Sequence, residues 1–192
     1  MKTAVLVHGW PDKKEYFDPT QPAPSNAHWF PWVQRQLLLN GILAQTPEMP
    51  DAWEPNYEKW SALFERFDIN EDTTLIGHSC GGGFLVRWLS EHNVKVGKVV
   101  LVAPWLDPDH QIDKNFFSFA IDERLVEKTD GLSIMYSTDD FSDIIESIEI
   151  LKSALKDAVF NAFADKGHFV LEDMKTEAFP ELLETLGLKA LY

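Results

Sequence analysis

The chain has 192 residues, of which 45% are hydrophobic, and its formal net charge is −14. This length is sufficient for one sizeable core and short for two, so we expect a single domain over residues 1–192. The negative charge disfavours nucleic acids and anionic membranes as partners, because both attract clustered Lys and Arg side chains. Cys80 is the only cysteine, which excludes an internal disulfide, and no early apolar run resembles a signal peptide, so we expect a cytoplasmic protein.

Short apolar segments alternate along the chain with longer segments of helical periodicity. This alternation is typical of an α/β fold, in which one mainly parallel sheet is covered by helices on both faces. Several of the short segments are continuously apolar, as strands buried on both faces should be. The six predicted strands are residues 3–7, 42–46, 73–76, 98–102, 132–137 and 159–163.

Three apolar stripes have the three-and-four spacing of helices that bury one face. They lie within residues 84–89, 141–155 and 179–186. Pro180 is compatible with the third stripe because it falls in the first turn of the helix, where no backbone hydrogen bond is lost. We therefore predict three helices at these places, the last of them closing the fold.

Two segments, residues 10–26 and 104–130, do not follow the alternation of strands and helices. Both leave the carboxyl ends of predicted strands, which is where open parallel sheets bind ligands. Aromatic and glycine residues in and beside these segments are our candidates for the wall of a substrate pocket. The candidates are Gly9, Trp10, Trp105, Phe116 and Phe117.

Residues 77–81 read Gly-His-Ser-Cys-Gly, a G-x-S-x-G motif centred on Ser79. The motif follows a predicted strand and precedes a predicted helix, which is the strand-turn-helix context of a nucleophile elbow. In such an elbow the serine occupies a tight, strained turn, and glycines at its flanks avoid collisions with the neighbouring strand and helix. The simpler alternative is a glycine-rich turn with a buried serine. The context favours Ser79 as a nucleophile.

A serine hydroxyl needs a base to accept its proton, and that base needs a partner to fix its tautomer. With a serine elbow, the chain order is nucleophile, acid, histidine, each after a strand. Asp139 and Asp140 follow the strand at 132–137, and His168 follows the strand at 159–163. We favour Asp140 as the acid, although either aspartate could instead cap the next helix. The alternative for His168 is an ordinary surface histidine.

Negative charge that develops on a carbonyl oxygen requires fixed hydrogen-bond donors. With a serine elbow, the donors are the backbone N–H after the nucleophile and an N–H from the loop after an early strand. These positions are Cys80 and Trp10. Since the backbone N–H of Cys80 is the expected donor to the oxyanion, we expect its thiol to be unreactive and to serve only in packing.

Five short motifs occur in a fixed order along the chain, and together they resemble the small serine hydrolases typified by retinoblastoma-binding protein nine. They are His8-Gly9, Glu48-Met49-Pro50-Asp51, Gly77-His78-Ser79, Ser137-Thr138-Asp139-Asp140 and Gly167-His168-Phe169. The resemblance implies an α/β-hydrolase fold without the first antiparallel hairpin, a minimal lid, and the second aspartate of the pair as the acid. The chain departs from this family in its longer segment at 10–26 and in Phe141, where a proline usually follows the acid.

These observations predict a serine hydrolase that cleaves a small ester or amide through an acyl-enzyme. Two alternatives remain open: a hydrolase-like scaffold that binds a protein partner, and an acyltransferase with the same three residues. A protein partner is possible but nothing in the sequence indicates one. No phosphate-binding glycine loop and no zinc motif is present, and the acidic residues at 107–113 lack the glycine and glutamate of a calcium loop. We therefore expect neither cofactor nor metal.

Overall fold

The structure, a computed structural model that describes residues 2–192, contains one six-stranded sheet in the order β2-β1-β3-β4-β5-β6, in which all neighbouring strands are parallel. All six predicted strands are present to within two residues at each end. The strands are β1 (Thr3–Val7), β2 (Leu43–Gln45), β3 (Thr73–His78), β4 (Val99–Val102), β5 (Leu132–Ser137) and β6 (Val159–Phe163).

The order of the strands determines where a ligand can bind. From β1 the chain moves outward to β2 and then returns to the other side of β1 to form β3. The connections that leave β1 and β3 therefore run in opposite directions, and a crevice opens between the carboxyl ends of these two strands. Residues that directly follow β1 and β3 lie at this crevice.

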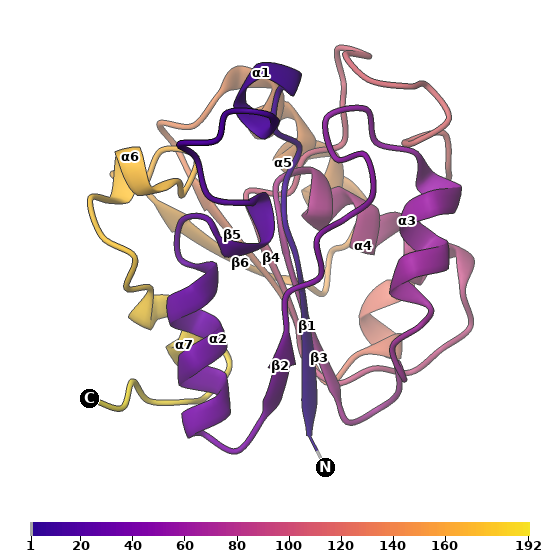
Figure 1. Cartoon of the computed structure of the whole chain (residues 1–192). Helices are drawn as coiled ribbons and strands as arrows, with labels where there is room; N and C mark the ends of the chain where they lie inside the picture. Colours follow the sequence, from indigo (N-terminus) through magenta and orange to yellow (C-terminus); the bar gives the residue numbers. More distant parts are fainter. Residues whose placement is uncertain (1) are drawn as a thin grey trace.

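Helices cover both faces of the sheet, with α2 and α7 on one side and α3 and α4 on the other (Figure 1). The three predicted stripes correspond to α4, α5 and α7, although α5 begins one residue after Phe141, which stays 67% exposed and outside the core. The seven helices of residues 2–192 are α1 (Lys13–Tyr16), α2 (Phe30–Leu39), α3 (Tyr57–Phe64), α4 (Cys80–Glu91), α5 (Ser142–Ala154), α6 (Leu171–Met174) and α7 (Pro180–Thr185).

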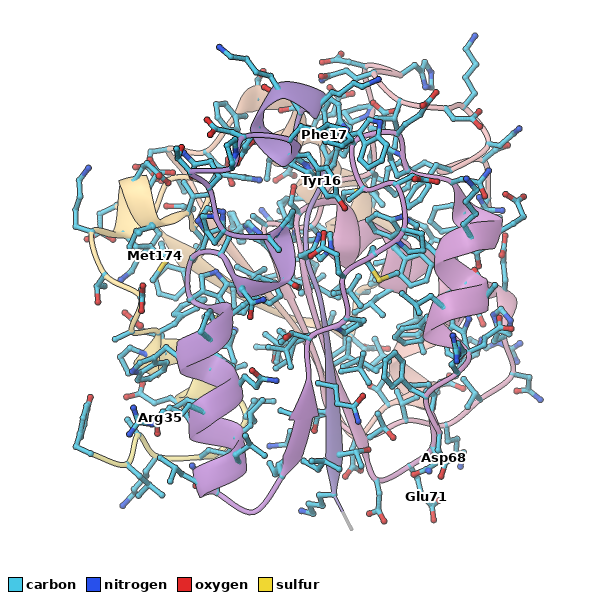
Figure 2. All side chains as sticks on the ribbon, viewed as in Figure 1. Tyr16, Phe17, Arg35, Asp68, Glu71 and Met174 are labelled. Atoms are coloured by element: carbon cyan, nitrogen blue, oxygen red, sulfur yellow. The ribbon has the colours of Figure 1, made fainter. Side chains whose placement is uncertain are left out.

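Apolar side chains fill the space between the sheet and its helices, and the central strands are almost fully apolar. All four residues of β4 are buried, as expected for a parallel strand that is covered on both faces. Charged side chains such as Arg35, Asp68 and Glu71 point outward at the end of the molecule opposite Tyr16 and Phe17 (Figure 2). Across residues 2–192, no helix combines the length and the apolar character that crossing a bilayer requires.

Candidate active site

Ser79 occupies the sharp turn between β3 and α4. Its backbone has φ 53° and ψ −123°, a left-handed region that residues other than glycine rarely adopt. Four backbone hydrogen bonds hold the turn: the Ser79 N–H donates to the Val102 carbonyl, and the Ser79 carbonyl accepts from the N–H groups of Gly82, Gly83 and Trp105. Such strain persists only where the surroundings enforce it, and it is concentrated at functional sites.

Glycines around the turn allow the first turn of α4 to approach the sheet closely. A Cβ atom added to Gly81 would lie 2.3 Å from the carbonyl oxygen of Val7, and one added to Gly77 would lie 2.7 Å from the Cα atom of Gly82. Both distances are too short for real atoms. The glycines of the G-x-S-x-G motif are therefore required by packing against β1 and within the turn itself.

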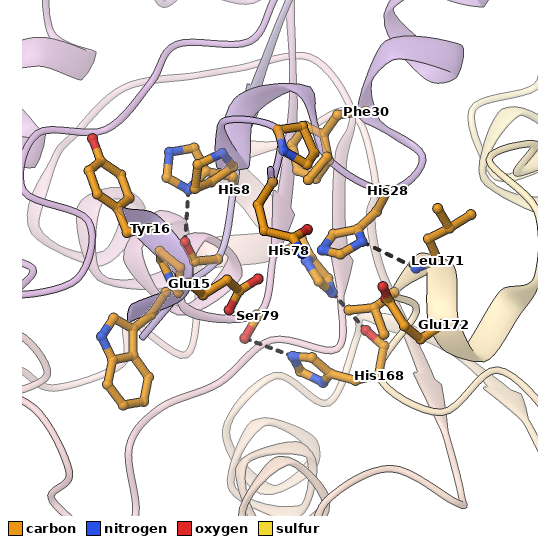
Figure 3. Close-up of a pocket in the computed structure, with 18 of the residues that line it drawn as sticks. His8, Glu15, Tyr16, His28, Phe30, His78, Ser79, His168, Leu171 and Glu172 are labelled. Atoms are coloured by element: carbon orange, nitrogen blue, oxygen red, sulfur yellow. Dashed lines mark hydrogen bonds between the residues drawn. The ribbon is translucent and has the colours of Figure 1, made fainter. Parts of the chain in front are cut away.

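The three predicted catalytic side chains meet at the carboxyl ends of β3, β5 and β6. His168 Nε2 lies 3.0 Å from Ser79 Oγ (Figure 3). On the other side of the ring, His168 Nδ1 lies 3.0 Å from Asp140 Oδ1 and 3.1 Å from Asp140 Oδ2. The Asp140 carboxylate is fully buried. This geometry connects a hydroxyl, an imidazole and a carboxylate through short contacts, an arrangement that can move a proton away from the hydroxyl.

Asp139 makes its hydrogen bonds to the backbone and side chain of neighbouring residues and supports the loop that carries His168. Its Oδ1 accepts hydrogen bonds from the Gly167 N–H at 3.2 Å and from the Ser137 hydroxyl. The Ser137 hydroxyl lowers the pKa of Asp139, and Ser137 Oγ accepts in turn from the Lys166 N–H. The two aspartates that the sequence left as alternatives therefore have different neighbours in the structure.

Two further side chains hold the backbone of His168. Its N–H donates to Asp173 Oδ2 at 2.8 Å, and its carbonyl accepts from His78 Nε2 at 2.8 Å. Sequence reasoning did not identify either partner. His78 was visible as a variable position of the elbow motif, whereas nothing near Asp173 indicates its role.

Of the two predicted oxyanion donors, Cys80 directly follows Ser79, and Trp10 directly follows Gly9, where an added Cβ atom would lie 3.0 Å from the Ser79 Cβ atom. Within residues 2–192, neither the Cys80 nor the Trp10 backbone N–H donates to a protein acceptor. The Trp10 side chain is fixed by a hydrogen bond from Nε1 to the Trp53 carbonyl and by stacking on Trp105, with ring centroids 5.4 Å apart. Burial raises the pKa of the Cys80 thiol well above its ordinary value, which keeps the thiol protonated and unreactive.

His8 holds the loop after β1, a role that sequence reasoning also missed. Its Nε2 accepts from the Met49 N–H at 2.9 Å, so its proton is on Nδ1, which donates to the Gly9 carbonyl at 2.8 Å. Burial lowers the pKa of His8, and the neutral ring therefore makes both bonds. Since Gly9 immediately precedes Trp10, His8 positions the Trp10 N–H.

A cavity of about 480 Å³ opens beside Ser79 and His168. Its walls come mainly from the segment after β1 and from the residues after His168. Gly9 and Trp10 line it, as predicted, together with residues that sequence reasoning did not identify. These additional lining residues include Glu15, His28, Phe141, Leu171, Glu172 and Asp173.

The other three predicted pocket residues do not line this cavity. Phe116 is 1% exposed and packs edge-on against Trp60, with ring centroids 5.1 Å apart. Trp105 stacks on Trp10, and Phe117 packs edge-on against Trp105. The segment at 104–130 folds over α4, where Gly83 leaves room for it, and its aromatic rings are therefore used in packing.

His78 makes the stability of the fold dependent on pH. Burial lowers the pKa of His78 well below its ordinary value of 6.5, and the nearby His168 and His28 rings lower it further. Below about pH 6.5, the unfolded chain therefore binds a proton at this position that the native protein does not. We expect the free energy of unfolding to fall with decreasing pH, by up to about 1.4 kcal/mol per pH unit for this residue.

Urea unfolding between about pH 8 and pH 5 measures this slope. The matched variant is His78→Gln, whose amide NH₂ can replace Nε2–H as the donor to the His168 carbonyl but does not titrate. His8 and His28 also have pKa values lowered by burial, so some slope should remain. An unchanged slope in His78→Gln would contradict the assignment.

Known proteins resemble this chain over nearly its whole length. Residues 4–187 match the family described as "Serine hydrolase". YdeN of Bacillus subtilis is 26% identical over 192 residues, which cover 96% of this chain and 94% of YdeN. The crystal structure of the ydeN gene product is similar with a TM-score of 0.78 and 24% identity, covering 97% of both chains.

More distant structures share the fold. A YdeN-like protein from Pectobacterium atrosepticum has a TM-score of 0.65 and 16% identity, covering 96% of this chain and 89% of that one. FphF, a fluorophosphonate-binding serine hydrolase of Staphylococcus aureus, has a TM-score of 0.55 and 16% identity, covering 92% and 81%. The six-stranded parallel sheet is that of the α/β hydrolases. Because the family match extends over nearly the whole sequence, the chain belongs to the serine hydrolase family.

Proposed function

We propose that the protein hydrolyses a small ester or amide through an acyl-enzyme formed on Ser79. The observation that carries the proposal is the continuous series of contacts, none longer than 3.1 Å, from Asp140 through His168 to Ser79 Oγ. This series ends at the wall of a cavity. A volume of about 480 Å³ lies within the range of sites for small molecules.

In the acylation step, Ser79 Oγ attacks the substrate carbonyl carbon while His168 Nε2 takes the hydroxyl proton. The buried Asp140 carboxylate stabilises the imidazolium, and the N–H groups of Cys80 and Trp10 bind the oxyanion. When the tetrahedral intermediate collapses, the bond to the leaving group breaks and His168 returns the proton to the departing alcohol or amine. The product of this step is the Ser79 ester of the acyl group.

Deacylation follows the same chemical steps, with water as the nucleophile in place of Ser79. His168 Nε2 takes a proton from water, the resulting hydroxide attacks the acyl carbon, and the same two N–H groups bind the oxyanion. Collapse breaks the ester bond, and His168 protonates Ser79 Oγ. The net reaction consumes one water molecule and releases an acid and an alcohol or amine.

A fluorophosphonate probe tests the proposal. We expect the native protein to gain the mass of one phosphonyl group, located on the peptide that contains Ser79, because the activated hydroxyl displaces fluoride from phosphorus. FphF, whose fold is similar, is itself a fluorophosphonate-binding serine hydrolase. Urea-denatured protein is the control, since unfolding separates Ser79 from His168. If native protein stays unlabelled under conditions that label a known serine hydrolase, the proposal is wrong.

A further inference from the structure

His28 lies on the wall of the cavity beside Ser79 and is not used in the mechanism above. It follows the 3₁₀ helix η1 (Pro24–Asn26) and has a φ of 56°, which is uncommon for a residue other than glycine. Its Nδ1 accepts a hydrogen bond from the Leu171 N–H at 3.1 Å (Figure 3). This bond connects the segment after β1 to the start of α6 across 143 residues of sequence.

The bond to Leu171 determines which ring nitrogen of His28 carries the proton. A nitrogen that accepts a hydrogen bond has no proton, so in the neutral ring the proton is on Nε2. Burial lowers the pKa of His28, which keeps the ring neutral near pH 7. Nε2 lies on the side of the ring away from Leu171 (Figure 3), and among residues 2–192 the ring makes its one side-chain hydrogen bond through Nδ1. Since His28 lines the cavity, its neutral Nε2–H is a donor that a ligand in the cavity can use.

The charges around His28 restrict the chemistry of its acceptor. Glu172 and Asp173 line the same cavity, and their charges act on the pKa of His28. Glu15 lines it as well, and its pKa is raised by burial and then by the charges of Asp12 and Glu172. Three acidic side chains in the wall of this cavity disfavour an anionic ligand, because like charges repel. The acceptor that suits Nε2–H is an uncharged oxygen.

We propose that His28 is a specificity-determining residue, whose Nε2–H donates to an uncharged oxygen on the acyl or leaving group of the substrate, away from the scissile carbonyl. The oxygen belongs to a second carbonyl, a hydroxyl or an ether. The favoured substrates are therefore oxygenated esters or amides, and plain alkyl analogues are disfavoured because they leave Nε2–H unpaired. This inference rests on the proposed reaction at Ser79.

A series of p-nitrophenyl esters tests the inference. Each member has an unbranched acyl chain in which one methylene is replaced by a carbonyl or an ether oxygen at successive positions, and the unsubstituted chain is the reference. We expect the wild-type protein to prefer at least one oxygenated ester by about tenfold or more in kcat/KM. A second series, with the replacements in the alcohol of the ester, tests the leaving-group side.

Two substitutions of His28 separate its two nitrogens. In His28→Asn, the amide oxygen takes the place of Nδ1 and continues to accept from Leu171, but nothing replaces Nε2–H, and asparagine tolerates a positive φ. In His28→Gln, the amide NH₂ takes the place of Nε2–H, but the acceptor for Leu171 is lost. We expect His28→Asn to lose the preference for the oxygenated ester and His28→Gln to keep it, with a lower melting temperature.

The ester preferences test the role of His28, whereas fluorophosphonate labelling tests the proposed reaction at Ser79. A wild-type protein without any preference across both series, or a His28→Asn variant that keeps its preference, would overturn the inference while fluorophosphonate labelling of Ser79 continues. Absence of labelling would instead overturn the proposed function. If a variant does not fold, the preference of the wild-type protein alone supports or overturns the inference.

Discussion

Replacing Ser79 with alanine is expected to lower kcat for ester hydrolysis by about 10⁶-fold, because the acyl-enzyme can no longer form. The remaining rate should come from binding and from the oxyanion donors alone. Alanine and serine have the same steric restrictions at φ 53°, so the strained turn should persist and the melting temperature should change little. Steady-state hydrolysis of an activated ester, followed by release of p-nitrophenol, measures the effect.

Ser153→Ala is the matched control for this experiment. Ser153 is exposed on α5 and donates only to the Glu149 carbonyl, so the same chemical change there should leave the rate within the error of the assay. The two variants should be expressed and purified in parallel to exclude a contaminating esterase. A Ser79→Ala variant that retains more than about a hundredth of the wild-type kcat would contradict the role of Ser79 as the nucleophile.

The central strands could be predicted because strands that are buried on both faces are almost continuously apolar in sequence. β4, with four buried apolar residues, is evident from its composition alone. The short helices α1 and α6 have only four residues each, which is too few to show a period, and α1 depends on the Asp12 side chain that accepts from the Glu15 N–H. α2 and α3 were not predicted, although Phe30, Val33 and Leu37 of α2 have the helical spacing.

For the candidate site, the sequence indicates some residues and gives no sign of others. Ser79 is marked by a local motif and His168 by its place after the last strand, whereas the order of strands alone left Asp139 and Asp140 as alternatives for the acid. The pocket wall could not be predicted, because the course of a long irregular segment depends on packing. Phe116 is buried against Trp60, and the tautomer of His28 follows from the hydrogen bond that its Nδ1 accepts from the Leu171 N–H.

The Asp140 carboxylate is expected to contribute strongly to the rate of hydrolysis. Asp140→Asn is expected to lower kcat by about 10⁴-fold, because the buried negative charge that stabilises the His168 imidazolium is removed. The hydrogen bonds of Asp140 give a second reason for the expected loss of kcat. Asp140 Oδ1 accepts from the Phe141 N–H at 2.7 Å, while both carboxylate oxygens contact His168 Nδ1. An amide must present its NH₂ at one of these contacts, which favours the imidazole tautomer that carries its proton on Nε2 and cannot accept the proton of Ser79.

Asp139→Asn is the matched comparison, since it makes the same change at the neighbouring residue. Asp139 accepts from the Gly167 N–H and the Ser137 hydroxyl, and an amide oxygen can accept both bonds. We expect kcat to fall by no more than about tenfold, through a looser loop rather than a lost charge. Equal losses in the two variants would show that the carboxylates act together on the position of His168, whereas a larger loss in Asp139→Asn would assign the orienting role to Asp139.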